Sequence, residues 1–271
     1  TVLPTVMEGA MARGIAAGLV ATSTITHATP ASFVSHVPSR RNQAVIAQQL
    51  LHSGLNIIFG GGKSYFIPSD ETGSKRNDER NLIEDSRKIG FEYVSTASEL
   101  SSCTSSKILG LFAMDAMGKN SDEPTLEQMS KKAIETLRNQ PNGFFLMIEG
   151  SQIDWAGHDN DFQYLIREMK AFDDAVKVGL DFAKENENTL VVVTADHETG
   201  GLLLMGGTVD GKDIKVDWGT NYHTGQMVPV FASGKGSWMF SGINDNTVFA
   251  KNFARFLGIN DFPGLNTNIY E

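Results

Sequence analysis

Residues 144–158 read Phe-Phe-Leu-Met-Ile-Glu-Gly-Ser-Gln-Ile-Asp-Trp-Ala-Gly-His, an apolar run that turns abruptly into a polar segment. The run 144–148 is typical of a central strand that is covered on both faces of a parallel sheet. A second apolar run, residues 189–194, is followed in the same way by the polar segment Ala-Asp-His-Glu-Thr-Gly-Gly. Functional groups gather at the carboxyl ends of parallel strands, so both polar segments are candidate parts of a site.

Helical and strand-like patterns alternate outward from these two runs. Residues 125–140 and 161–185 carry the apolar stripe of amphipathic helices, and residues 18–25 form a further apolar strand pattern. Residues 201–217 predict a β-hairpin. This alternation predicts an α/β fold, a three-layer sandwich with a mainly parallel central sheet. Since no linker or repeat interrupts the pattern, we expect a single domain over residues 1–271.

The composition excludes several classes of protein. The 271 residues contain 23 Lys and Arg against 32 Asp and Glu, a net charge of −9, with no basic stripe that would suit a general nucleic-acid binder. No apolar window is long enough for a membrane span. The single cysteine, Cys103, excludes an internal disulfide and any metal site built from cysteines.

Carboxylates and imidazoles stand together in both polar segments. Asp154 and His158 are four residues apart and would share one face of a helix. Adjacent Asp196 and His197 can bind one ion only if the backbone turns there. Oxygen and imidazole ligands without cysteine suit zinc, or harder ions where oxygen dominates. Either pair alone is more often an ordinary surface pair, helix cap or turn than a metal site. The two pairs together are consistent both with a metal site and with an ordinary surface.

Four segments, in order along the chain, resemble the metal-binding motifs of the alkaline phosphatase family. They are residues 27–40 (HATPASFVSHVPSR), 149–158, 194–201 and, more loosely, 222–225. The resemblance covers nearly the whole chain and implies a metal-dependent phosphomonoesterase with two zinc ions and one magnesium ion. Within the first segment, Thr29 followed by Pro30 is typical of a helix start with Thr29 as its N-cap.

The resemblance also implies a role for each matching residue. One zinc ion would take Asp154, His158 and His223; the second would take Asp196 and His197; the third ion, usually magnesium, would take Glu149 and Thr29, with His27 just outside its ligands. Arg40 would grip the substrate phosphate, because a guanidinium fork bonds two phosphate oxygens at once. Trp155 stands where family members contact the phosphate or its water.

The nucleophile of the family is missing from these residues. It is a serine in an Asp-Ser-Ala segment upstream of the stretch that matches residues 27–40, and no Asp-Ser-Ala occurs in this sequence. Ser23 is the nearest upstream serine, but its surroundings predict a strand interior. We therefore interpret the sequence as the C-terminal portion of an alkaline phosphatase that lacks the N-terminal strand, a bridging aspartate and the nucleophilic serine.

The same resemblance sets the other expectations. The substrate would be a phosphate monoester and the product inorganic phosphate, the family is usually a homodimer, and its members are usually periplasmic or extracellular. Two alternatives stay open. One is a relative of the same superfamily, such as a phosphodiesterase, a sulfatase or a phosphoglycerate mutase. The other is a non-catalytic module that binds metal or phosphate.

The missing nucleophile gives a first prediction. The purified 271-residue chain should bind zinc weakly and have little or no phosphatase activity, because it lacks the bridging ligand and the attacking serine. Hydrolysis of p-nitrophenyl phosphate, followed by absorbance, measures this. Robust turnover by the purified chain would contradict the interpretation.

Overall fold

The computed structural model describes residues 2–118 and 120–263. Packing divides the chain into two compact units. We call Thr1–Glu149 with Ile243–Glu271 the sheet unit, and Gly150–Gly242 the hairpin unit. A single domain over residues 1–271 stays a prediction.

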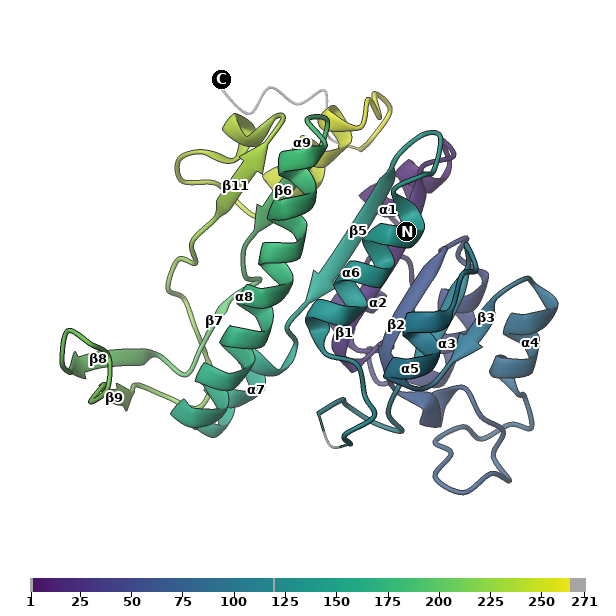
Figure 1. The fold of residues 1–271 in the computed structure, drawn as a ribbon, viewed down its shortest axis with the longest axis horizontal. Helices are drawn as coiled ribbons and strands as arrows, with labels where there is room; N and C mark the ends of the chain where they lie inside the picture. The colour runs from purple at the N-terminus through teal and green to yellow at the C-terminus, as the bar shows by residue number, and fades with distance from the viewer. Residues whose placement is uncertain (1, 119, 264–271) are drawn as a thin grey trace. The chain divides into compact units, whose positions relative to one another are not determined.

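The sheet unit is built on five parallel strands in the order β3-β4-β2-β1-β5 (Figure 1). They are β1 (Ala16–Thr24), β2 (Ile57–Gly61), β3 (Glu92–Val94), β4 (Ile108–Leu111) and β5 (Phe144–Glu149). The predicted α/β fold with a parallel central sheet is confirmed. Because all five strands run the same way, their carboxyl ends share one edge of the sheet.

Helices flank the sheet on both faces (Figure 1). They are α1 (Val6–Met11), α2 (Ala28–Ala31), α3 (Gln43–His52), α4 (Leu82–Lys88), α5 (Ala97–Ser102), α6 (Leu126–Leu137) and α9 (Thr247–Phe256), with a short turn η1 (Lys63–Tyr65). Side chains alternate along a strand, so Leu19 lies in the core cluster that includes Leu50 of α3, whereas Gly18 faces Leu137 of α6. This gives the expected three layers.

The hairpin unit contains two helices and three strand pairs. Its elements are α7 (Gln152–Asp159), α8 (Phe162–Glu185), β6 (Leu190–Val193), β7 (Glu198–Thr199), β8 (Leu202–Gly206), β9 (Lys215–Trp218), β10 (His223–Thr224), β11 (Phe231–Gly234) and η2 (Ser237–Phe240). The pairs β6 with β11, β7 with β10 and β8 with β9 are antiparallel. The pair β8 with β9 confirms the hairpin predicted over residues 201–217.

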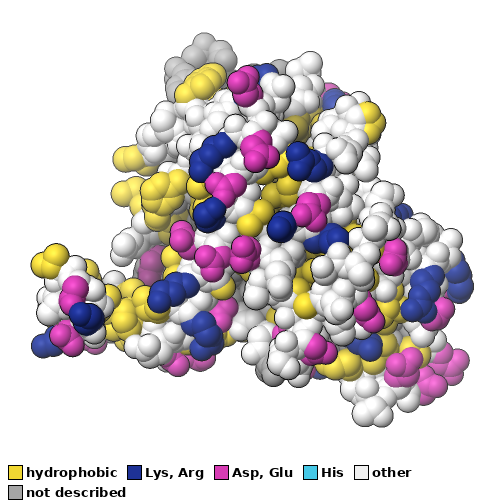
Figure 2. Space-filling model, in the orientation of Figure 1, with side chains coloured by type: hydrophobic (Ala, Val, Ile, Leu, Met, Phe, Trp, Pro, Cys, Tyr) yellow, Lys and Arg dark blue, Asp and Glu magenta, His cyan; other side chains and the backbone are white. Residues whose placement is uncertain are grey.

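The long helix α8 is amphipathic. The Asp161 side chain caps it by accepting hydrogen bonds from the Gln163 and Tyr164 backbone N–H groups. Figure 2 shows acidic and basic side chains interleaved over α8. Among the described helices, none combines the length and the apolarity that crossing a bilayer requires.

Two local predictions are wrong. Within the sheet unit β5 pairs with β1 alone, at one end of the five-strand order, so the run 144–148 is not a central strand of that sheet. An apolar run does not distinguish edge from centre, because strand order is set by tertiary pairing. The N-cap of α2 is His27 and not Thr29, because the chain turns directly after β1, where the His27 N–H donates to the Thr24 carbonyl at 2.8 Å.

The end of β2 gives a stability prediction. A Cβ on Gly61 would lie 1.9 Å from the carbonyl oxygen of Asp115, and a backbone atom cannot rotate away. Gly61→Ala should therefore lower the free energy of unfolding by about 1–3 kcal/mol. Urea unfolding followed by circular dichroism measures this.

The matched control is Gly9→Ala in α1 of the same unit. Its Cβ would meet Ile259 at an ordinary 3.4 Å, and alanine favours a helix interior over glycine by about 0.5–1 kcal/mol. Equal loss of stability in both variants would show that the Asp115 contact does not constrain the fold.

Candidate metal centre

Helix α7 places Asp154 and His158 on one face, as the spacing of four residues predicts. The distance from Asp154 Oδ1 to His158 Nε2 is 3.4 Å, and both side chains are about one third exposed. Trp155 follows Asp154 on the same helix and is half-buried.

His223 completes a cluster of three donor groups. It lies on β10, directly opposite Thr199 of β7. Its Nε2 is 3.2 Å from His158 Nε2 and 3.6 Å from Asp154 Oδ1. We call Asp154, His158 and His223 the three-ligand cluster; their ligand atoms all lie within 4.8 Å of one another.

A main-chain carbonyl fixes the orientation of one imidazole. His158 Nδ1 is 2.7 Å from the carbonyl oxygen of Asn221, which can only accept, so Nδ1 carries the proton. In the neutral tautomer that this bond favours, the lone pair lies on Nε2, the atom that faces the cluster. Such a bond from the second ring nitrogen is the usual way in which a ligating histidine is oriented.

The spacing of the three donor atoms fits zinc. With zinc–ligand distances of 2.0–2.1 Å, two ligands of a tetrahedral ion stand about 3.3 Å apart. The three distances in the cluster, 3.2, 3.4 and 3.6 Å, bracket this value. Three protein ligands also leave one position of a tetrahedron open, as in catalytic zinc sites.

A second pair of ligand groups lies beside this cluster. Asp196 and His197 sit in the bend that follows β6, so the expected turn is present, and Asp196 Oδ2 is 3.4 Å from His197 Nε2. The His197 ring stacks on the His223 ring with centroids 3.5 Å apart and planes at 22°. The structure therefore brings all five predicted zinc ligands together within the hairpin unit.

Two further groups contact the three-ligand cluster and were not predicted from the sequence. The Thr199 hydroxyl lies 2.5 Å from Asp154 Oδ1. In the sequence, only its position two residues after His197 indicates that it could lie near the metal ligands. Asn221 contributes only a carbonyl oxygen, which no side-chain pattern reveals. Glu198, next to His197, is engaged elsewhere: it accepts hydrogen bonds from the Gly201 N–H at 2.8 Å and from the Thr224 hydroxyl.

The other candidate residues lie in the sheet unit. Glu149 ends β5 in register with Ala21 of β1, and α2, which carries Thr29, contacts both strands. Arg40 is exposed and its Nη2 donates to His27 Nε2 at 3.0 Å. His27, Thr29 and Glu149 thus gather at the carboxyl edge of β1 and β5.

Ser23 is fully buried within β1, where its hydroxyl donates to the Thr24 carbonyl at 3.0 Å. This agrees with the predicted strand interior and leaves Ser23 without access to a substrate.

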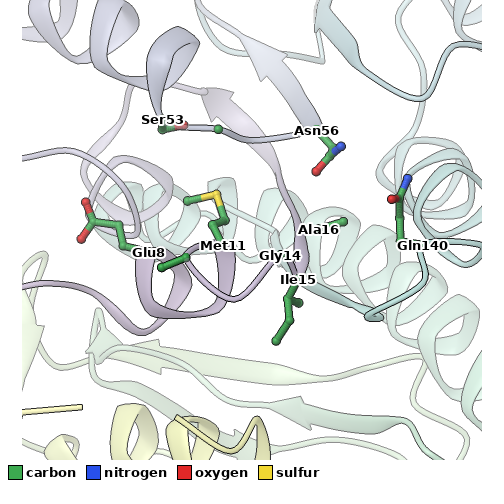
Figure 3. Close-up of a pocket in the computed structure, with 10 residues that line it drawn as sticks. Glu8, Met11, Gly14, Ile15, Ala16, Ser53, Asn56 and Gln140 are labelled. Carbon is green, nitrogen blue, oxygen red and sulfur yellow. The ribbon is translucent and has the colours of Figure 1, made fainter. Parts of the chain in front are cut away.

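A cavity of about 480 Å³ lies at the opposite edge of the sheet (Figure 3). Its lining comes from the residues that precede β1 and β2, from α1 and from Gln140 after α6; Glu8, Met11, Gly14 and Asn56 are examples. It contains none of the candidate residues, which follow the carboxyl ends of their strands.

Comparison with known proteins agrees with these motifs. The model of the family "Alkaline phosphatase" matches residues 2–213. "Alkaline phosphatase 3" of Bacillus subtilis (strain 168) is 36% identical, over 94% of this chain and 71% of its own length. "Alkaline phosphatase 4" of the same organism is 41% identical over 73% of this chain, and the chain spans only 43% of its length.

A solved structure matches as well. A variant of the alkaline phosphatase from the Antarctic bacterium TAB5, with Mg bound in its M3 site, superimposes with a TM-score of 0.82 and 35% identity. The match covers 95% of this chain and 76% of that one. With a family match over most of its length and relatives above 30% identity, the chain belongs to the alkaline phosphatase family.

Proposed function

We propose that this chain carries the zinc ligands and the phosphate-binding arginine of an enzyme that hydrolyses phosphate monoesters at alkaline pH. The observation that carries the proposal is the three-ligand cluster, whose donor atoms stand 3.2–3.6 Å apart with one imidazole lone pair already oriented inward. Membership of the alkaline phosphatase family supports the reaction class.

The metal ligands divide into three sets. Asp154, His158 and His223 would hold one zinc ion, Asp196 and His197 a second, and Glu149 and Thr29 a magnesium ion, with His27 just outside that last set. When bound, two such ions neutralise charge on the attacking and leaving oxygens of a phosphoryl transfer. The relative with Mg in its M3 site supports a metal at the third position.

Arg40 is the group that would grip the phosphate. Its planar guanidinium can bond two phosphate oxygens, and its exposure leaves the fork accessible to a ligand. In this structure Arg40 Nη2 donates to His27, which holds the arginine side chain at the carboxyl edge of the sheet. Trp155, beside Asp154, would contact the phosphate or its water.

The covalent step belongs to a serine that is not among these 271 residues. In the intact protein its oxygen would bond to phosphorus as the alcohol leaves, and water would then break the serine–phosphorus bond to release inorganic phosphate. We further propose a homodimer and a periplasmic or extracellular location, both by analogy with the family. Comparing phosphate monoesters with diesters as substrates of the intact protein separates this function from that of a phosphodiesterase.

One prediction of this function concerns the three-ligand cluster in the intact protein. Asp154→Asn or His223→Ala should release one zinc ion per chain and abolish turnover, because each removes a ligand from a three-ligand site. Metal analysis after gel filtration measures the loss. His52→Ala, an exposed histidine of α3, is the control and should keep its zinc. Unchanged zinc in the Asp154 and His223 variants would contradict the assignment.

A separate prediction distinguishes phosphate binding from metal binding. Arg40→Ala should weaken competitive inhibition by inorganic phosphate about 10- to 100-fold, the loss expected from about 1.5–3 kcal/mol of charge-assisted hydrogen bonding. Metal content should stay the same. Arg41→Ala is the matched control, since it removes the adjacent exposed arginine. Equal inhibition of the Arg40 variant and the native enzyme would remove Arg40 from the site.

A further inference from the structure

We propose that Thr199 is a positioning residue whose single hydroxyl orients one ligand from each of the two zinc sets, Asp154 and His197. The proposal rests on the proposed function, because it concerns the same metal centre. In this proposal the Thr199 hydroxyl holds the Asp154 carboxylate in place and selects the ring tautomer of His197.

The contacts of the hydroxyl are short and specific. Thr199 Oγ1 donates to Asp154 Oδ1 at 2.5 Å and lies 3.2 Å from His197 Nδ1. Asp154 Oδ1 is also the atom that faces His158 and His223. A carboxylate oxygen has two lone pairs, so one can accept from Thr199 while the other faces the cluster.

Counting protons assigns the tautomer of His197. A hydroxyl has one hydrogen, and an ionised carboxylate can only accept, so the Thr199 hydrogen is directed to Asp154. The contact with His197 then requires that Nδ1 carry a proton and donate to Thr199 Oγ1. This leaves the lone pair on Nε2, the atom that stands 3.4 Å from Asp196 Oδ2 and that would bind the second ion.

The backbone is built to bring this hydroxyl so close. Thr199 faces helix α7 at Gly157, where an added Cβ would lie 2.8 Å from the Thr199 carbonyl oxygen and 3.0 Å from the Thr199 Cβ. Only glycine lets β7 approach α7 to this distance. The branched Cβ of threonine also restricts χ1, which limits the directions that the hydroxyl can take.

One hydroxyl therefore acts on two ligand sets. Without it, the Asp154 carboxylate loses this hydrogen bond, and His197 can take the tautomer that carries its proton on Nε2, which cannot bind the second ion through that atom. Loss of such a hydrogen bond to a ligand typically costs about 10- to 100-fold in metal affinity.

The test compares Thr199→Val, which keeps the shape and removes the hydroxyl, with Thr199→Ser, which keeps the hydroxyl. Thr208→Val is the control, since its hydroxyl bonds Asp210 in the β8–β9 hairpin, outside the cluster. Zinc affinity of the 271-residue chain is measured by competition with a chromogenic chelator. The ¹⁵N shifts of the imidazole nitrogens in the metal-free chain report the His197 tautomer at pH 8.

We expect Thr199→Val to lose about 10- to 100-fold in zinc affinity and to shift His197 toward the Nε2–H tautomer, whereas Thr199→Ser and Thr208→Val stay close to the native chain. Equal zinc affinity in the native and Thr199→Val chains would overturn the proposal. So would an Nε2–H tautomer of His197 in the native chain, a result that does not depend on whether the valine variant folds.

The two proposals fail separately. The zinc content of the Asp154 and His223 variants of the intact protein tests the metal centre of the proposed function, while the tautomer of His197 in the metal-free 271-residue chain decides the role of Thr199. If zinc binds to both chains equally, the metal centre stands and the role of Thr199 is wrong.

Discussion

Three electron-rich donor atoms, one carboxylate oxygen and two imidazole nitrogens, are held 3.2–3.6 Å apart in this protein. A lone pair and a carboxylate at such a distance are favourable together only when a proton or a cation lies between them. The Asn221 carbonyl accepts from His158 Nδ1, which turns the Nε2 atom of this ring toward the other two donor atoms. The surrounding elements of the hairpin unit, α7 and the β7–β10 pair, serve to hold that arrangement.

Close backbone approach makes this arrangement feasible. Gly157 on α7 and Gly200 after β7 lie against each other, with a Cβ on Gly200 falling 2.8 Å from the Gly157 carbonyl oxygen and 2.7 Å from the Trp218 ring. Gly200 also has φ +93°, which L side chains rarely adopt. Gly200 is therefore required for the close approach of this segment to α7 and to the Trp218 ring.

The sheet unit places a second group of candidate residues at the carboxyl edge of its strands. Its parallel ladder puts the end of β5, with Glu149, next to β1, and the chain then turns into α2 at His27. An exposed arginine is tethered there by a single hydrogen bond to His27. Candidate ion ligands and the arginine proposed to bind phosphate therefore lie at the carboxyl edge, while the cavity of the unit lies at the other edge.

The sequence by itself determined the apolar runs, the amphipathic helices, the hairpin and the pairs Asp154–His158 and Asp196–His197, because side-chain periodicity and spacing are local properties. His223 and the roles of the ligands came from the resemblance to a family. The sequence did not determine that β5 ends the strand order of the sheet unit, that His27 occupies the N-cap position of α2, that Asn221 orients His158, or that the Thr199 hydroxyl lies between Asp154 and His197. Each of these depends on contacts between segments that are brought together by folding. Tertiary packing sets the order of the strands. It also sets which main-chain carbonyl accepts from His158 and which side chain accepts the Thr199 hydroxyl hydrogen, because these partners come from segments that are distant in the sequence.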